Sequence, residues 1–179
     1  MNNLLPTIYL LVLFIALSTM LFFLFRQILR RKEIESELFE LQKRSRSGNA
    51  TALDQYSLGS IYLSKRLFDQ AILQFSSALK NWDKLDAEGL STLYNTIGFT
   101  YFESGQYDVS IYYYKEAIKL NSGYVIAMNN LAYSYEKKKM FQEAIRTYSK
   151  VLAFDTNNKV ANEKLMSLQK RSRIRDDRI

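Results

Sequence analysis

The strongest pattern in the chain is an apolar stretch at its start. Residues 4–25 contain 22 positions without one charged side chain. As a helix this stretch would extend about 33 Å, enough to cross a hydrocarbon core of about 30 Å. A cleaved signal peptide is the alternative, but no Lys or Arg precedes the stretch, and it exceeds the roughly 7 to 15 apolar residues of such signals. We predict a transmembrane anchor over residues 1–25.

The next segment alternates charged and apolar residues. Ile34, Leu38 and Leu41 recur at i, i+4 and i+7 among Arg, Lys and Glu, and no helix breaker interrupts residues 26–44. This pattern predicts a basic juxtamembrane helix and linker over residues 26–49, flexible near Ser47 and Gly48. The apolar stripe would allow two copies to pair as a short coiled coil, so a homodimer through residues 26–44 stays open.

A third pattern begins near residue 50 and repeats large and small residues at helical spacing. The small residues are expected where two helices approach closely, which predicts helical hairpins. The first helices carry the series Tyr94, Ile97, Gly98, Tyr101, then Met128, Leu131, Ala132, Tyr135, and upstream Gln55, Leu58, Gly59, Tyr62. The second helices carry Ala71, Phe75, Ala78, then Ser110, Tyr114, Ala117, then Ala144, Tyr148, Val151.

A period of about 34 residues with these motifs resembles the tetratricopeptide repeat. The resemblance implies an all-α fold, with the N-terminal transmembrane helix followed by a solenoid. The repeat domain would cover residues 50–170. Its parts would be three hairpins and a capping helix, at about 52–85, 91–124, 125–158 and 159–170.

Two departures from the family pattern affect the connections. The family's closing proline is replaced by Asp83, Ser122 and Thr156, although Gly123 and residues 155–158 offer turn and cap chemistry. The first two repeats are offset by 39 residues rather than 34. We place the extra residues in a loop from Asp83 to Leu90, with Asp86, Glu88 and Gly89 loop-like, and expect seven helices after the linker.

The net charge of +7 is not spread evenly over the chain. Residues 26–46 contribute 7 − 4 = +3 and residues 159–179 contribute 7 − 3 = +4, whereas the repeats between them are nearly neutral. A neutral array argues against nucleic-acid binding. The basic residues after the apolar stretch favour anionic headgroups and retention on the side of synthesis. The tail, residues 171–179, is predicted to be a solvated end, with a docking element as the alternative.

The chain contains no Cys and no His. This excludes disulfides, thiolate nucleophiles, Cys/His metal sites and Ser-His-Asp catalysis. The six glycines form no phosphate-binding loop, and the acidic residues fall at positions that repeat proteins expose. We therefore predict a non-enzymatic protein without a cofactor or a metal.

The family resemblance also implies a binding surface, because its first helices line a concave groove. An aromatic and amide-rich lining is suited to binding a peptide. If the side-chain amides of Asn95 and Asn129 face solvent, they would form hydrogen bonds with the peptide backbone. Alternatively, Phe99 and Phe102 pack only between repeats. Carried onto this sequence, the groove positions are Tyr56, Ser60, Leu63, Asn95, Phe99, Phe102, Asn129, Tyr133 and Glu136.

Some members of the family hold the carboxylate tail of chaperones with a basic clamp. That clamp needs Lys and Asn in the first repeat and basic residues in the third. Here Tyr56 and Ser60 occupy the first pair of positions, and Ile126 and Asn130 occupy the second. A chaperone-tail receptor is therefore disfavoured.

The whole arrangement resembles the small membrane-anchored repeat proteins of plastids and cyanobacteria that assist photosystem I assembly. The resemblance implies a non-catalytic scaffold for photosystem I subunits or assembly intermediates. It would act at the stromal face of the plastid thylakoid membrane, or the cytoplasmic face in a bacterium. The alternative is a membrane receptor or adaptor of another pathway, such as a protein-import receptor, which would bind amphipathic presequences. An enzyme is the third class, disfavoured by the absence of His and Cys.

Overall fold

The computed structural model describes residues 4–176, and side chains within residues 7–171. This part of the chain forms eight α-helices and no strand. The chain divides into two compact units between Gly48 and Asn49. The first unit contains α1, and the second contains α2 to α8.

Helix α1 (Leu4–Arg46) is continuous over 43 residues. It therefore joins the apolar stretch and the following charged segment in one helix, as the sequence predicts. Its large apolar side chains are exposed between Ile8 and Leu29, so they need a lipid or protein environment. Among the described helices it is the one long and apolar enough to cross a membrane. Gly48, with φ +74°, ends the segment in a left-handed conformation.

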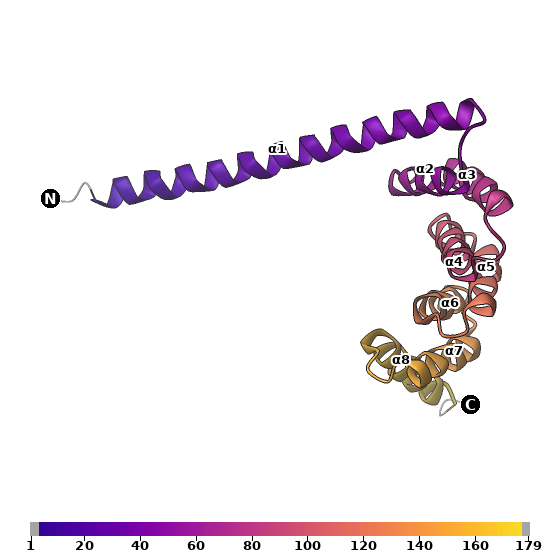
Figure 1. Ribbon diagram of the computed structural model, residues 1–179. Coiled ribbons are helices and arrows are strands. Elements are labelled where there is room, and N and C mark those ends of the chain that lie inside the picture. The colour runs from indigo at the N-terminus through magenta and orange to yellow at the C-terminus, as the bar shows by residue number, and fades with distance from the viewer. Residues whose placement is uncertain (1–3, 177–179) are drawn as a thin grey trace. The chain divides into compact units, whose positions relative to one another are not determined.

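The second unit is a stack of antiparallel helices. Figure 1 shows α2, α4, α6 and α8 following one another along one side, and α3, α5 and α7 along the other. This arrangement confirms the all-α repeat solenoid with three hairpins and a final helix. The helices are α2 (Ala52–Ser64), α3 (Phe68–Asn81), α4 (Ala87–Glu103), α5 (Tyr107–Leu120), α6 (Val125–Lys137), α7 (Phe141–Phe154) and α8 (Lys159–Asp176).

Small residues set the distance between the two helices of a hairpin. A Cβ atom added to Gly98 would lie 2.8 Å from the Tyr114 ring and 3.2 Å from the backbone oxygen of Ser110. A Cβ added to Gly59 would lie 2.7 Å from the Phe75 ring. Both aromatic rings are fully buried, so the glycines are needed for close helix packing.

All three hairpins turn through one left-handed residue. Arg66, Gly105 and Lys139 have φ values of 59°, 82° and 60°. In each turn the next backbone N–H returns to the carbonyl oxygen of the last tyrosine of the first-helix motif; Leu67 N, for example, lies 2.9 Å from Tyr62 O. This Schellman-type closure satisfies carbonyl groups that the helix end would leave unpaired.

The connection before α4 differs from the sequence-based prediction. Asp86 is the N-cap of α4, and its carboxylate accepts hydrogen bonds from Gly89 N at 2.8 Å and from Trp82 Nε1 at 3.0 Å. The hydrogen bond from Gly89 N and, to a smaller extent, the one from Trp82 lower the pKa of the Asp86 carboxyl. Glu88 and Gly89 therefore lie in a helix, and their placement in a loop was wrong. The extra residues lengthen α4 to 17 residues, against 13 in α2 and in α6.

Side-chain turns occupy the connections in which the family has proline. The carboxylate of Asp83 accepts from Leu85 N at 2.9 Å, and the Asn121 amide oxygen accepts from Gly123 N at 3.1 Å. Asp155 closes the third connection in the same way, and Asn158 caps α8 through Ala161 N at 3.0 Å. The predicted turn and cap chemistry at Gly123 and residues 155–158 is confirmed.

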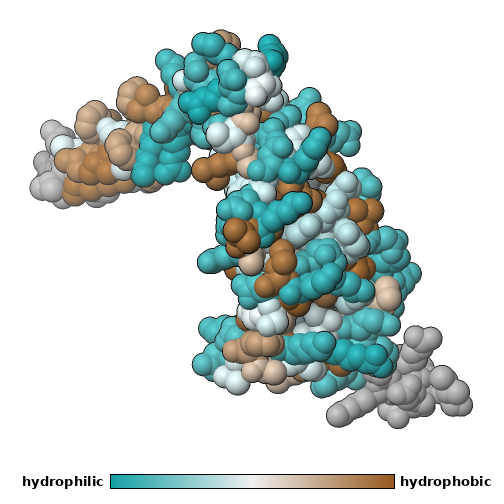
Figure 2. Space-filling model, turned by 45° about the vertical axis from the view of Figure 1, so that its right-hand side comes forward, coloured by the Kyte–Doolittle hydropathy of each residue, from teal (hydrophilic) through white to brown (hydrophobic). Residues whose placement is uncertain are grey.

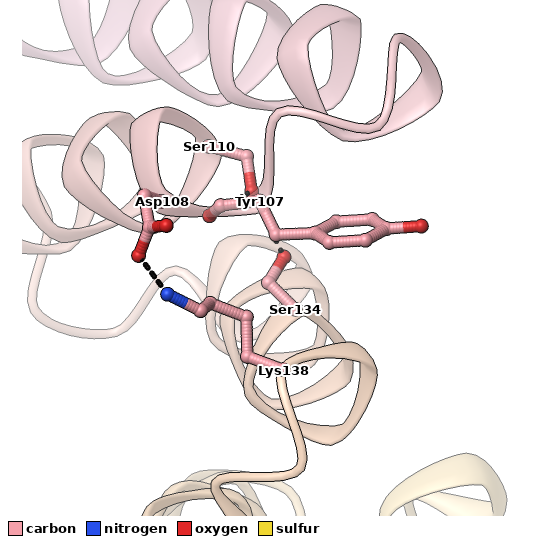
Figure 3. A network of polar contacts seen from close by, with 5 residues as sticks. All are labelled: Tyr107, Asp108, Ser110, Ser134 and Lys138. Atoms are coloured by element: carbon pink, nitrogen blue, oxygen red, sulfur yellow. Dashed lines mark hydrogen bonds and ion pairs between the residues drawn. The ribbon is translucent and has the colours of Figure 1, made fainter.

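Polar contacts join the second hairpin to the third (Figure 3). The hydroxyl oxygens of Ser110 on α5 and Ser134 on α6 lie 3.2 Å apart in a buried position. The Lys138 ammonium, just after α6, pairs with the Asp108 carboxylate on α5. Each hydroxyl also lies 2.9 Å from a carbonyl oxygen of its own helix, Tyr107 for Ser110 and Asn130 for Ser134. The bond between the two hydroxyls therefore favours one relative placement of α5 and α6, because displacement would break this contact.

Candidate functional site

The first part of the predicted groove is used for packing between helices. The Tyr56 ring lies 5.7 Å from Phe75 and 6.0 Å from Trp82, measured between centroids, and its hydroxyl is 3.4 Å from the Thr96 Oγ1 atom on α4. The Ser60 hydroxyl donates to the Tyr56 carbonyl oxygen at 2.9 Å. Leu63 packs against the buried core of the first two hairpins. These side chains therefore have internal partners.

The middle of the predicted groove is partly paired. Asn95 on α4 accepts a hydrogen bond at 3.1 Å from the Asn130 side-chain amide on α6. The Phe102 ring lies 5.3 Å from Tyr107 and 5.2 Å from Tyr133, so it packs between repeats as the alternative interpretation expects. Phe99 is 40% exposed.

The last part of the groove contains an open recess of about 260 Å³ between α6, α7 and α8. Of the predicted groove residues, Asn129 and Tyr133 line this recess. The complete lining is Asn129, Asn130, Tyr133, Tyr148, Val160 and Lys164.

A charged network lies beside the recess. The Glu136 carboxylate accepts a hydrogen bond from the Tyr148 hydroxyl at 2.6 Å and pairs with the Lys164 ammonium at 3.4 Å. Burial, and then the hydrogen bond to Glu136, raise the pKa of Tyr148. The Tyr148 hydroxyl therefore stays a hydrogen-bond donor. Glu136, a predicted groove residue, thus has two partners of its own and serves to position Tyr148 and Lys164.

Two cations approach the same aromatic ring. The Lys164 Nζ atom lies 4.8 Å from the Tyr133 ring centroid, and the Lys137 Nζ atom lies 5.1 Å from it. Both distances are within the range of cation–π attraction. Lys137 takes part in no ion pair among the described residues.

One polar atom in the recess wall lacks a partner. The side-chain oxygen of Asn129 is buried and has no hydrogen-bond partner, the single such side-chain atom in the described part of the chain. A buried polar group without a partner typically costs about 1 to 3 kcal/mol. The side-chain oxygen of Asn129 therefore does not meet the condition, stated above, that the amide faces solvent.

Several residues of the recess were missed by the sequence analysis. Val160, Lys164 and Tyr148 were not among the predicted groove positions. Lys164 follows Asn130 by 34 residues, and Val160 follows Ile126 by the same interval. The repeat period therefore continues into α8, and this signal could have placed both residues on the concave side.

The described residues contain no group of three or more acidic, His or Cys side chains that could hold a metal ion. What the recess offers is binding chemistry: an exposed ring, the Lys164 ammonium, amides and an apolar wall, while the Lys137 ammonium lies over the same ring without lining the recess. Figure 2 shows hydrophobic residues in small groups among hydrophilic ones over the visible face of the repeat unit. That face shows no extended hydrophobic patch.

Comparison with solved structures shows the fold alone, because the identities are low. MamA matches with a TM-score of 0.69 and 20% identity, over 82% of each chain. YrrB, described as a tetratricopeptide repeat protein with an unusual peptide-binding site, matches with a TM-score of 0.67 and 19% identity, over 79% of this chain and 71% of that one.

Comparison with protein sequences is more specific. A tetratricopeptide repeat family model matches residues 89–157. The ycf37 protein of Guillardia theta is 41% identical over 179 residues, which cover 100% of both chains. The chloroplastic tetratricopeptide repeat domain-containing protein PYG7 of Arabidopsis thaliana is 37% identical over 93% of this chain, which spans 55% of that protein. The chain therefore belongs to the ycf37 family of plastid-type tetratricopeptide repeat proteins.

Proposed function

We propose that the protein is a membrane-anchored, non-catalytic scaffold that helps photosystem I subunits or assembly intermediates to come together at the stromal face of the thylakoid. The observation that carries this proposal is the joining, in one chain, of an exposed apolar helix and a repeat array. The tetratricopeptide repeat is a protein-interaction scaffold, and plastid-type relatives support the compartment.

Helix α1 would be the anchor, with the repeats on the stromal side. Arg26, Arg30, Arg31 and Lys32 follow the apolar stretch directly, and such residues stay on the side of synthesis. The test is an alkaline carbonate wash of thylakoids, followed by protease treatment from the stromal side. The protein should stay in the membrane and lose its repeats to the protease. Release by the wash would contradict the anchor, and protection would contradict the orientation.

The partner is tested by affinity purification of the full chain from solubilised thylakoid membranes. Recovery of photosystem I subunits supports the proposal. Recovery of amphipathic presequences would instead favour an import receptor, and recovery of neither would contradict both.

The concave side would hold the partner, and variants test this assignment. Tyr133→Ala, in the groove, should reduce the recovery of partners. Arg146→Ala on α7 is the matched control, because Arg146 is exposed and lies outside the groove. Equal recovery with both variants, each with a normal melting temperature, would contradict the concave side as the working surface.

A further inference from the structure

We propose that the recess between α6, α7 and α8 binds a peptide segment in which a carboxylate side chain stands next to an apolar side chain. This inference rests on the proposed function, since it assumes that the concave side binds a protein partner. It adds the chemistry that the partner must bring.

The lysine side chains near Tyr133 indicate that the bound segment carries a carboxylate. Lys137 and Lys164 both approach the Tyr133 ring, at 5.1 Å and 4.8 Å from its centroid. The carboxylate of Glu136 pairs with Lys164 and also accepts from Tyr148, while Lys137 has no ion pair among the described residues. Of these two ammonium groups, Lys164 thus has a carboxylate partner and Lys137 has none among the described residues. A further carboxylate near the Tyr133 ring would give the exposed Lys137 ammonium an ion pair.

The apolar side chain follows from the recess wall. Val160 is 56% exposed and Tyr133 is 36% exposed, so both present apolar surface to an incoming group. The open recess, of about 260 Å³, can therefore take an apolar side chain of an incoming segment against this wall.

The unpaired side-chain oxygen of Asn129 indicates that the ligand is a peptide. Its side-chain oxygen is buried in the recess wall without a partner. A backbone N–H of an extended segment in the recess would supply the missing donor after a small rotation of this side chain. An inorganic anion offers no such donor, so the amide favours a peptide over a simple ion.

The recess shares Asn130 with the positions of the basic clamp that holds chaperone tails, but its cations come from other elements. The clamp positions in the first and third repeats are Tyr56, Ser60, Ile126 and Asn130. The cations described here come from the end of α6 and from α8. The proposed subsite is formed by the third hairpin together with the final helix.

The test measures binding of labelled octapeptides to the full chain in phosphatidylcholine nanodiscs, by fluorescence anisotropy. One peptide carries Leu-Asp in a Gly-Ser background with blocked ends, and the other carries Leu-Asn. We expect the Leu-Asp peptide to bind several-fold tighter to the parent protein. The double variant Lys137→Gln/Lys164→Gln should remove this preference, a loss of about five- to tenfold for two ion pairs near a surface.

The matched control is Lys80→Gln/Lys150→Gln, which removes two exposed charges from α3 and α7 and should change binding less than about twofold. Lys137→Arg/Lys164→Arg keeps the charges and should keep the preference. Equal binding of the two peptides, no binding of either, or full displacement by acetate at the peptide's concentration would each overturn the subsite. Recovery of photosystem I subunits from membranes would still test the proposed function separately.

Discussion

The two ends of the repeat array use equivalent positions for different purposes. Tyr56 on α2 and Asn129 on α6 stand at the same place in their repeats, two residues before the motif's Leu58 and Leu131. Tyr56 packs against Phe75 and Trp82, whereas Asn129 leaves an oxygen unpaired in the wall of a recess. A position that the family pattern assigns to the groove can therefore serve folding in one hairpin and binding in another.

The cause of this difference is the element that follows each hairpin. After α3, the Trp82 indole and the lengthened α4 fill the space beside Tyr56. After α7, helix α8 contributes Val160 and Lys164, which leave a recess open. The N-terminal end is thus closed by aromatic packing, and the C-terminal end stays available to a partner.

The largest expected effect tests the hairpin geometry on which both ends depend. Gly98→Leu should lower the free energy of unfolding by about 1 to 3 kcal/mol or more, because the new side chain meets the Tyr114 ring and the Ser110 backbone. The measurement is thermal or urea unfolding. Gly123→Ala is the control, since a Cβ there would find its nearest atom at 3.8 Å. An unchanged stability of Gly98→Leu would contradict the close packing.

The second effect compares one tyrosine from each end. Tyr56→Ala should cost about 2 kcal/mol of stability, because it removes ring packing within the array. Tyr133→Ala should cost less than about 1 kcal/mol, because its ring is more exposed, yet it should weaken partner recovery. Unfolding and recovery are measured on both variants. If the two lose equal stability, the contrast between the ends is wrong.

The third effect compares two asparagines. Asn95→Ala should destabilise by about 0.5 to 1.5 kcal/mol, since it removes the acceptor of the Asn130 amide. Asn129→Ala should be neutral or stabilising by up to about 1 kcal/mol, since it removes an unpaired buried oxygen. Chemical unfolding gives both values. A loss of stability in Asn129→Ala as large as in Asn95→Ala would show that the oxygen has a partner.

The smallest effect concerns the left-handed turn residues. Gly105→Ala should cost about 1 kcal/mol, because an alanine at φ 82° is strained. Lys139→Gly, at the equivalent turn of the third hairpin, should stabilise by only a few tenths of a kcal/mol, since relief of strain is partly offset by the flexibility of glycine in the unfolded chain. Melting curves would reveal the opposite signs, and a stability loss in Lys139→Gly would contradict the strain.

Much of the fold could be predicted because its signals are local. The recurrence of small residues at Gly59, Gly98 and Ala132 marks three hairpins without any knowledge of distant contacts. The start of α4 was misplaced because Gly89 has a low helix preference. The capping of Gly89 N by Asp86 outweighs that preference, and a search for an Asp immediately before a possible helix start would have found it.

The candidate site was less accessible to prediction, because its properties arise between elements. The sequence by itself determined an apolar helix at the start, a neutral array of three hairpins and a basic end, since periodicity and charge are properties of the chain. Only the tertiary structure decided that Tyr56 is a packing residue, that Asn129 lacks a partner and that Lys137 and Lys164 meet at Tyr133. These outcomes depend on whether a neighbouring helix fills the space beside a side chain, and residues far apart in the sequence decide that.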